Sequence, residues 1–143
     1  MSTLTRFIRG SKIGDNARSA RIVSNVIDFA EYYKDTGTKV QNADVINALK
    51  LDAGTVVLTA GFKVLTAESG TSTTQLGLGS SADKFVGATD ITTTTDFGDA
   101  LAAPEYLTAD AYVTMTIATN VSGGAATGRI LVWALIANAT GDY

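Results

Sequence analysis

The chain has 143 residues, with 11 Lys and Arg against 14 Asp and Glu, and it contains neither Cys nor His. This length suits one domain, which buries roughly two thirds of its unfolded surface and needs no disulfides to hold a core. Without Cys and His no Ser-His-Asp, Cys-His or Cys-based zinc site can be built, so we expect no enzyme, no cofactor and no metal site. No segment has the apolar length of a signal peptide or a membrane span, so we expect no membrane partner.

The two ends of the chain differ in charge. Residues 1–24 contain five basic residues and only Asp15 as an acid, a net +4, whereas residues 25–143 contain six basic and thirteen acidic residues, a net −7. We therefore divide the chain into a basic N-terminal arm, 1–24, and a body, 25–143. The arm is expected to bind an acidic neighbour, such as a nearby subunit, through Arg6, Phe7, Ile8, Arg9, Lys12, Arg18 and Arg21.

Two other interpretations of the arm remain open. It can be a solvated, partly ordered terminus, as terminal segments often are unless they dock. Nucleic acid is not a favoured partner, because Phe7 is the arm's only aromatic side chain for base stacking and the acidic body would repel phosphates.

The first half of the body predicts three strands. Residues 26–33 alternate in hydropathy and are closed by a turn at 34–37. Residues 42–51 fit a helical turn or a strand, and we favour the strand. Residues 55–66 alternate with period two after a turn at 52–54, with Val56, Leu58, Ala60, Phe62 and Val64 on one face and Thr59, Lys63 and Leu65 on the other.

The second half predicts further short strands. Residues 73–78 and 84–86 are short strands, 91–98 is a threonine-rich loop or edge, and 106–118 alternates with Val113, Met115 and Ile117 inward. The 21 threonines suit exposed pleated faces, because their branched side chains favour strands and their hydroxyls favour water. We predict an all-β fold, a β-sandwich of jelly-roll type with an extended N-terminal arm.

The last predicted strand, 130–137, is the only stretch of eight apolar residues without a polar interruption. Alternation places Ile130, Val132, Ala134 and Ile136 on one face. One face lines the core and the other needs a second cover, so Leu131, Trp133 and Leu135 are a possible subunit contact. We predict a homo-oligomer, with a trimer favoured among closed cyclic assemblies, and Trp133 as a packing anchor rather than a ligand platform.

Asp90, Asp96 and Asp99 lie near one another among threonines, which raises the question of a Ca²⁺ site. The spacing and closing Glu of an EF-hand are absent, so a solvated acidic loop is favoured.

Five segments carry a resemblance to a known family. They are Ala53–Leu58, Gly61–Glu68, Leu76–Phe85, Tyr106–Asp110 and Gly128–Ala134. In this order they resemble a family of small virion structural proteins of tailed bacteriophages, over about residues 25–137. The resemblance implies a capsid decoration (cement) protein made in the host bacterial cytoplasm. Such a protein would bind the major capsid protein and lie on the capsid surface of the virion.

Other functions stay open. The chain could be another virion component, such as a part of the tail or a fibre. A carbohydrate-binding β-sandwich would need an exposed aromatic platform, for which Tyr32, Tyr33, Tyr106 and Tyr112 are candidates. A carboxylate-only enzyme such as a glycosidase would need two acids held about 5 to 10 Å apart in a cleft.

Overall fold

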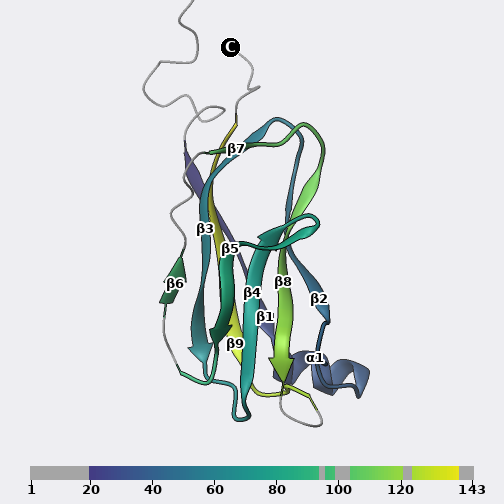
Figure 1. Ribbon diagram of the computed structural model, residues 1–143. Helices are drawn as coiled ribbons and strands as arrows, with labels where there is room; N and C mark the ends of the chain where they lie inside the picture. The colour runs from purple at the N-terminus through teal and green to yellow at the C-terminus, as the bar shows by residue number, and fades with distance from the viewer. Residues whose placement is uncertain (1–19, 94–95, 99–103, 121–123, 139–143) are drawn as a thin grey trace, which may run out of the picture.

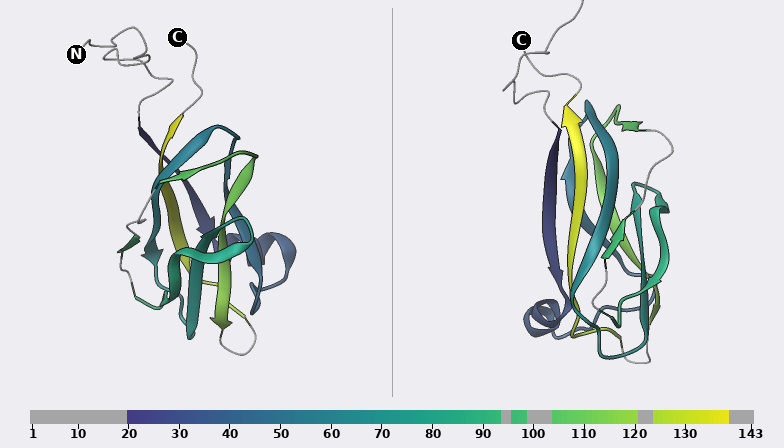
Figure 2. Two further views of the ribbon diagram at one scale, coloured as in Figure 1. Left: turned by 45° about the horizontal axis from the view of Figure 1, so that its top comes forward. Right: turned by 90° about the vertical axis from the view of Figure 1, so that its left-hand side faces the viewer.

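The fold is a two-layer sandwich of antiparallel sheets (Figure 1, Figure 2). A computed structural model describes residues 20–93, 96–98, 104–120 and 124–138. The strands are β1 (Arg21–Asp28), β2 (Val45–Leu51), β3 (Thr55–Thr66), β4 (Ser72–Leu78), β5 (Ser81–Asp90), β6 (Asp96–Gly98), β7 (Glu105–Tyr106), β8 (Ala111–Asn120) and β9 (Arg129–Asn138). Within the described residues the single helix is α1 (Phe29–Thr36).

The strand order confirms the predicted all-β sandwich. The first sheet has the order β1-β9-β3-β6, with β7 also paired to β3, and the second has the order β2-β8-β4-β5. The first strand of the chain thus lies beside the last, and the second lies beside β8. This order is compatible with the jelly-roll type, which stays a prediction.

The core lies between the two sheets and is built by alternate residues. From β9, the predicted inward set of Ile130, Val132, Ala134 and Ile136 is at most 3% exposed. From β8, Val113, Met115 and Ile117 are fully buried, also as predicted. The period of two in these strands therefore identified their core faces correctly.

The predicted strand at 26–33 is wrong in its second half, because Phe29–Thr36 form α1. Asp28 caps the helix, since its Oδ1 accepts the backbone N–H of Glu31 at 3.1 Å. Gly37 ends the helix in the left-handed conformation, with φ of 72°. The short helix thus has a capping residue at each end, and these local signals outweigh the alternation of the apolar residues.

The last part of the predicted arm lies in a strand. Residues 21–24 belong to β1, where Ile22 pairs with Leu135 and Val23 with Ala134 of β9. The composition of residues 21–24 does not by itself predict a strand. These residues form one because they pair with the apolar strand β9. Residues 1–19 of the predicted arm lie outside the described residues.

A β-bulge shifts the faces of β3. The register with β9 is irregular between Val57 and Thr59, so Val57 is fully buried and Val56 only half-buried. Ala60, Phe62 and Val64 point inward as predicted and are at most 1% exposed. The expectation that Val56 and Leu58 continue this inward row is therefore wrong, because the extra residue reverses the alternation.

The connection from β4 into β5 passes over the outer face of the second sheet. Gly77 pairs with Thr114 of β8, and a Cβ on Gly77 would lie 1.9 Å from the carbonyl oxygen of Ser81. Thr114 is consequently only 4% exposed, although it alternates with the inward residues Val113 and Met115. Only glycine allows the backbone to approach this closely.

Glu68, between β3 and β4, holds the segment that leads into β9. The residue is 4% exposed, and its carboxylate accepts backbone N–H groups from Ala126 at 3.1 Å, Thr127 at 3.0 Å and Gly128 at 2.6 Å. Hydrogen bonds to a charged group are the stronger ones, and they offset the cost of burying this carboxylate. Glu68 therefore sets where β9 begins.

Gly77→Ala is expected to destabilise the protein by about 2 kcal/mol or more, because the added methyl group must displace the Ser81 backbone. Gly87→Ala in β5 is the matched control, since a Cβ there meets nothing within 4 Å. It should change stability by less than about 1 kcal/mol. Urea unfolding of both variants measures the difference, and equal stabilities would contradict the close approach at Gly77.

Glu68→Gln is expected to cost about 2 kcal/mol, because one carboxylate oxygen becomes an amide donor that faces backbone N–H groups. The control is Glu105→Gln, whose partner Lys84 lies at 3.4 Å and whose side chain is 43% exposed. Loss of this exposed pair should cost at most about 1 kcal/mol. Urea unfolding at neutral pH compares them, and a Glu68→Gln protein as stable as the control would refute the role of Glu68.

Candidate functional site

The acidic side chains of the described residues do not gather into a metal-binding cluster. No group of three Asp or Glu side chains among them is placed to hold a metal ion, and no helix in the described ranges is long and apolar enough to cross a membrane. Asp90 Oδ1 accepts the Thr92 hydroxyl at 2.7 Å and the Thr92 N–H at 2.8 Å, and these bonds lower the pKa of Asp90. Asp90 therefore closes a turn, while Asp99 and the side chain of Asp96 lie outside the described residues.

The clearest candidate for a binding surface is the outer face of the first sheet. Directly paired residues of antiparallel strands point to the same side of the sheet, and the register gives three rows across β1, β9 and β3. The rows are Val26–Leu131–Lys63, Ser24–Trp133–Gly61 and Ile22–Leu135–Thr59. The predicted contact residues Leu131, Trp133 and Leu135 thus form the centre line of this face.

Five apolar side chains make up this surface, which we call the apolar outer face: Ile22, Val26, Leu131, Trp133 and Leu135. Ile22 is 67% exposed and Val26 39% exposed, while the three β9 residues are half-buried. The outer face of the second sheet is different, because its β2 and β8 strands place Asn47 opposite Thr114. At this pair the outside of the second sheet is polar, whereas the centre line of the first sheet's outer face is apolar.

Trp133 lies in the middle of the apolar outer face, so it does not pack between the sheets. Its neighbours across the strands are Ser24 and Gly61, the two small residues of the central row. Gly61 is buried although it has no side chain, as expected where a large aromatic ring beside it covers a glycine. We therefore predict that Trp133 is a packing anchor on the outer face of the first sheet and not between the two sheets.

Most of the predicted partner-binding residues cannot be placed. Arg6, Phe7, Ile8, Arg9, Lys12 and Arg18 lie outside the described residues. Arg21 is placed as the first residue of β1, where it is exposed and pairs with Ile136.

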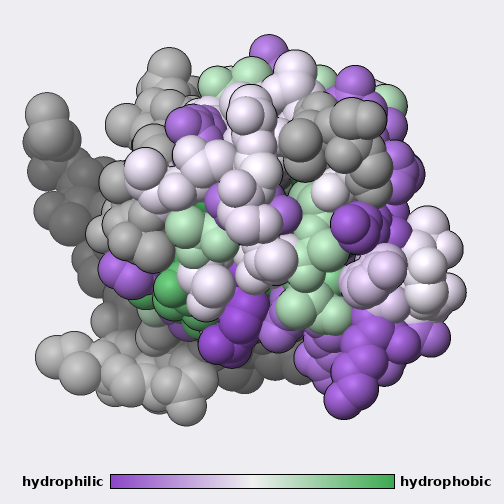
Figure 3. All heavy atoms as spheres, turned by 90° about the horizontal axis from the view of Figure 1, so that it is seen from below, coloured by the Kyte–Doolittle hydropathy of each residue, from purple (hydrophilic) through white to green (hydrophobic). Residues whose placement is uncertain are grey.

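A groove lies where the edge strands β1 and β2 meet α1, and we call it the edge groove. Its volume is ≈ 500 Å³, and it is lined by Val26, Ile27, Asp28, Phe29, Tyr32, Val40, Asp44, Val45 and Ile46. The end of the molecule that carries α1 shows apolar areas between strongly hydrophilic ones (Figure 3). Sequence reasoning missed this groove because it took 29–33 as strand, although Asp28 and Gly37 were available as capping signals.

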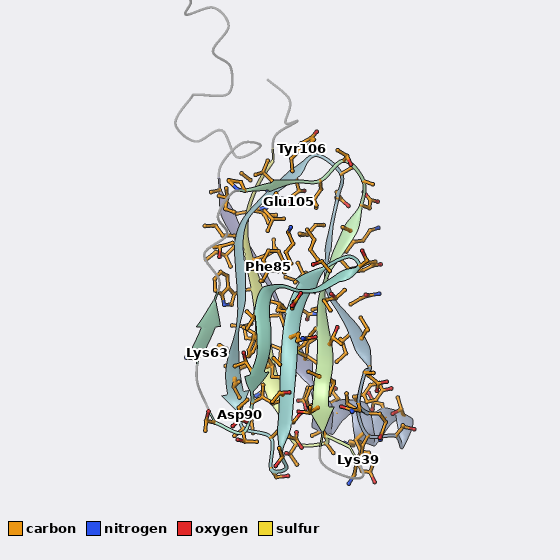
Figure 4. All side chains as sticks on the ribbon, viewed as in Figure 1. Lys39, Lys63, Phe85, Asp90, Glu105 and Tyr106 are labelled. Atoms are coloured by element: carbon orange, nitrogen blue, oxygen red, sulfur yellow. The ribbon has the colours of Figure 1, made fainter. Side chains whose placement is uncertain are left out.

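The four candidate tyrosines do not form one aromatic platform. Tyr32 and Tyr33 lie on α1, whereas Tyr106 lies in β7 at the opposite end of the sandwich (Figure 1, Figure 4). Tyr112 lies near the start of β8, whose other end is the one near α1. Each is between 41% and 50% exposed, but a sugar at one end could contact only part of the set.

We expect Leu135→Lys to weaken self-association at least tenfold, because it places a charge in the apolar outer face. The backbone pairing of β9 with β1 and β3 should remain, since only a side chain changes. The control is Asn47→Lys, which adds the same charge to the polar outer face of the second sheet. Light scattering over a concentration series gives the mass, and thermal melting verifies that both variants fold. A wild-type protein that is monomeric at tens of micromolar would contradict a self-contact at this face.

Comparison with known proteins finds likeness in structure alone. No protein-family model matches the sequence, and no curated protein matches it. A chain of the acid-stable capsid of Helicobacter pylori bacteriophage KHP30 is similar with a TM-score of 0.61 and 13% identity, covering 88% of this chain and 96% of that one. A chain of the cyanophage Pam1 capsid asymmetric unit is similar with a TM-score of 0.63 and 17% identity, and the match covers 94% of this chain and 97% of that one. A chain of the Ralstonia phage GP4 capsid is similar with a TM-score of 0.65 and 14% identity, and the match covers 93% of each chain. The sandwich is thus a fold found in the capsids of three phages.

Proposed function

We propose that this chain is a non-enzymatic virion structural protein of a tailed bacteriophage, and that it is a capsid decoration protein. It would bind the major capsid protein lattice from outside and stabilise the head. The observation that carries the proposal is the end-to-end structural match with chains of three phage capsids. The five segments that resemble virion structural proteins predict the same role, although no family model matches the sequence.

The extent of the match favours a small accessory chain. It covers 88 to 94% of this chain and 93 to 97% of the three capsid chains, so each of those chains is about as long as this one. The matched region is a single sandwich. It fits a role in which many copies each make a modest contact with a lattice.

The surfaces of the body suit this role. The apolar outer face supports a contact between copies, for which a closed trimer is favoured. The basic arm supports a contact with an acidic neighbour, through the six residues from Arg6 to Arg18 named above and Arg21 of β1. A protein that binds only the assembled lattice lowers the free energy of that state by mass action, so catalytic groups and cofactors are not needed.

The proposal includes a location, which is the capsid surface of the virion after synthesis in the host cytoplasm. The alternative among virion structural proteins is a component of the tail or of a fibre. A carbohydrate-binding module gains no support from the structure, because the exposed tyrosines lie toward two ends of the sandwich.

Deletion of residues 1–19 is expected to leave the melting temperature of the body nearly unchanged and to weaken binding to undecorated capsids at least tenfold. The deletion stops before β1, because removal of residues 21–24 would also remove half of an edge strand. Binding is measured by sedimentation of the protein with capsids at several salt concentrations. Unaltered capsid binding by the truncated protein would exclude the arm as a contact, and no binding by the full chain would refute the decoration role.

Replacing Arg6, Arg9 and Arg18 together by Gln should weaken capsid binding mainly at low salt. Ion pairs at exposed sites are screened over roughly 8 to 10 Å at physiological ionic strength, so the apolar residues of the arm must supply much of the affinity. Lys34→Gln and Lys50→Gln together remove two exposed positive charges of the body, and this variant is compared with the double change of Arg6→Gln and Arg9→Gln, which removes the same number from the arm. An equal loss of binding in arm and control variants would show that total charge, not the arm, is responsible.

A further inference from the structure

The edge groove lies at an open seam between the two sheets. β1 is an edge of the first sheet and β2 is an edge of the second. Among the described side chains, Asn25 of β1 links the seam, since its Nδ2 donates to the carbonyl oxygen of Ala48 in β2 at 3.0 Å. Edge strands keep unpaired backbone groups on one side, so an extended peptide can pair with either of them.

The lining of the edge groove selects for an apolar segment with positive charge. Val45 is 61% exposed and Tyr32 45% exposed, so both present apolar surface to an incoming chain. Two of the nine lining residues are acidic and none is basic. A segment that places apolar side chains in the groove and cations at its rim would match both properties.

Both carboxylates are held in place by the fold. Asp28 caps α1 through Oδ1, and its Oδ2 lies 3.3 Å from Arg129 Nε. Asp44 Oδ2 accepts the backbone N–H of Gln41 at 2.7 Å. A carboxylate has about four acceptor positions, so each retains capacity for a guanidinium.

The N-terminal part of this chain has the matching pattern. Arg6-Phe7-Ile8-Arg9 places two large apolar residues between two arginines. The arm as a whole is basic while the body is acidic, so the body of another copy attracts it.

The placement of the groove favours the arm of another copy over the chain's own arm. β1 starts at the end of the sandwich away from α1, whereas the groove lies beside α1 (Figure 1). The chain's own arm would have to reverse at Ala20 and run back along all eight residues of β1, about 26 Å. Val26 belongs to both the edge groove and the apolar outer face, so a copy that covers this face also comes close to the groove.

We propose that the edge groove receives residues 6–9 of a second copy of this chain, with Phe7 and Ile8 in the groove and Arg6 and Arg9 near Asp28 and Asp44. This identifies the acidic neighbour of the arm. It rests on the partner-binding role given to the arm in the proposed function, but not on binding to the capsid. In a closed ring each copy gives one arm and receives one, so every groove is filled.

Disulfide trapping tests the proposal, because the chain has no cysteine of its own. Full-length Phe7→Cys protein is mixed with full-length Val45→Cys protein that carries a mass tag, under mild oxidation. Val45 is exposed, so the fold should tolerate this change. The measured product is the covalent dimer of one untagged and one tagged chain. In the control mixture, tagged Tyr106→Cys protein replaces the tagged Val45→Cys protein. We expect at least tenfold more of this dimer with Val45→Cys than with the control. Tyr106 is 50% exposed and lies at the far end (Figure 4).

Two results would overturn the proposal. The first is a mixed dimer no more abundant than with Tyr106→Cys. The second is a Phe7→Cys, Val45→Cys double variant whose disulfide forms only within single chains, which would assign the groove to the chain's own arm. Trapping in a protein that does not bind capsids would leave the exchange intact and refute the decoration role. A protein that binds capsids but shows no trapping would refute the exchange of arms and leave the decoration role intact.

Discussion

The structure depends on β9, a strand that is apolar on both faces, of which the described residues bury only one completely. Ile130, Val132 and Ile136 are buried against the second sheet, and this burial supplies the apolar contact that holds the two layers together. Leu131, Trp133 and Leu135 point outward between β1 and β3. Exposed apolar rows of this kind mark contact surfaces in soluble proteins, so the same strand links the stability of the fold to its association.

The start of β9 also organises the α1 end of the sandwich. Gly128 donates its N–H to Glu68 at 2.6 Å and accepts the N–H of Phe29 at 2.9 Å. A Cβ on Gly128 would lie 3.3 Å from the Phe29 ring, so glycine lets α1 begin close against β9. Arg129, the next residue, pairs with the helix cap Asp28. The edge groove is thus bounded by elements that one short segment fixes together.

Period-two alternation was sufficient to predict the β-sandwich and most of its core, because residues 113–117 and 130–136 bury one face without interruption. It also identified Leu131, Trp133 and Leu135 as an outward row. It failed where short-range contacts decide the conformation. Asp28 and Gly37 cap a helix inside an alternating stretch, and one extra residue near Leu58 reverses the face of β3.

Alternation alone does not predict the edge groove: the capping signals at Asp28 and Gly37 could have located α1, but alternation cannot place α1 beside β1 and β2 in space. The burial of Thr114 is another long-range effect, since the β4 to β5 connection covers it above Gly77. The arm shows the opposite situation: its composition predicts binding, but its residues 1–19 lie outside the described residues.

The central claim is that this sandwich decorates a capsid as clusters of copies joined through the apolar outer face. An averaged density map of the intact particle that carries this chain tests it most directly. We expect density for the sandwich on the outer surface of the head, in groups in which Trp133 of each copy is covered by a neighbouring copy. Density confined to the tail, or isolated copies with Trp133 open to solvent, would contradict the account.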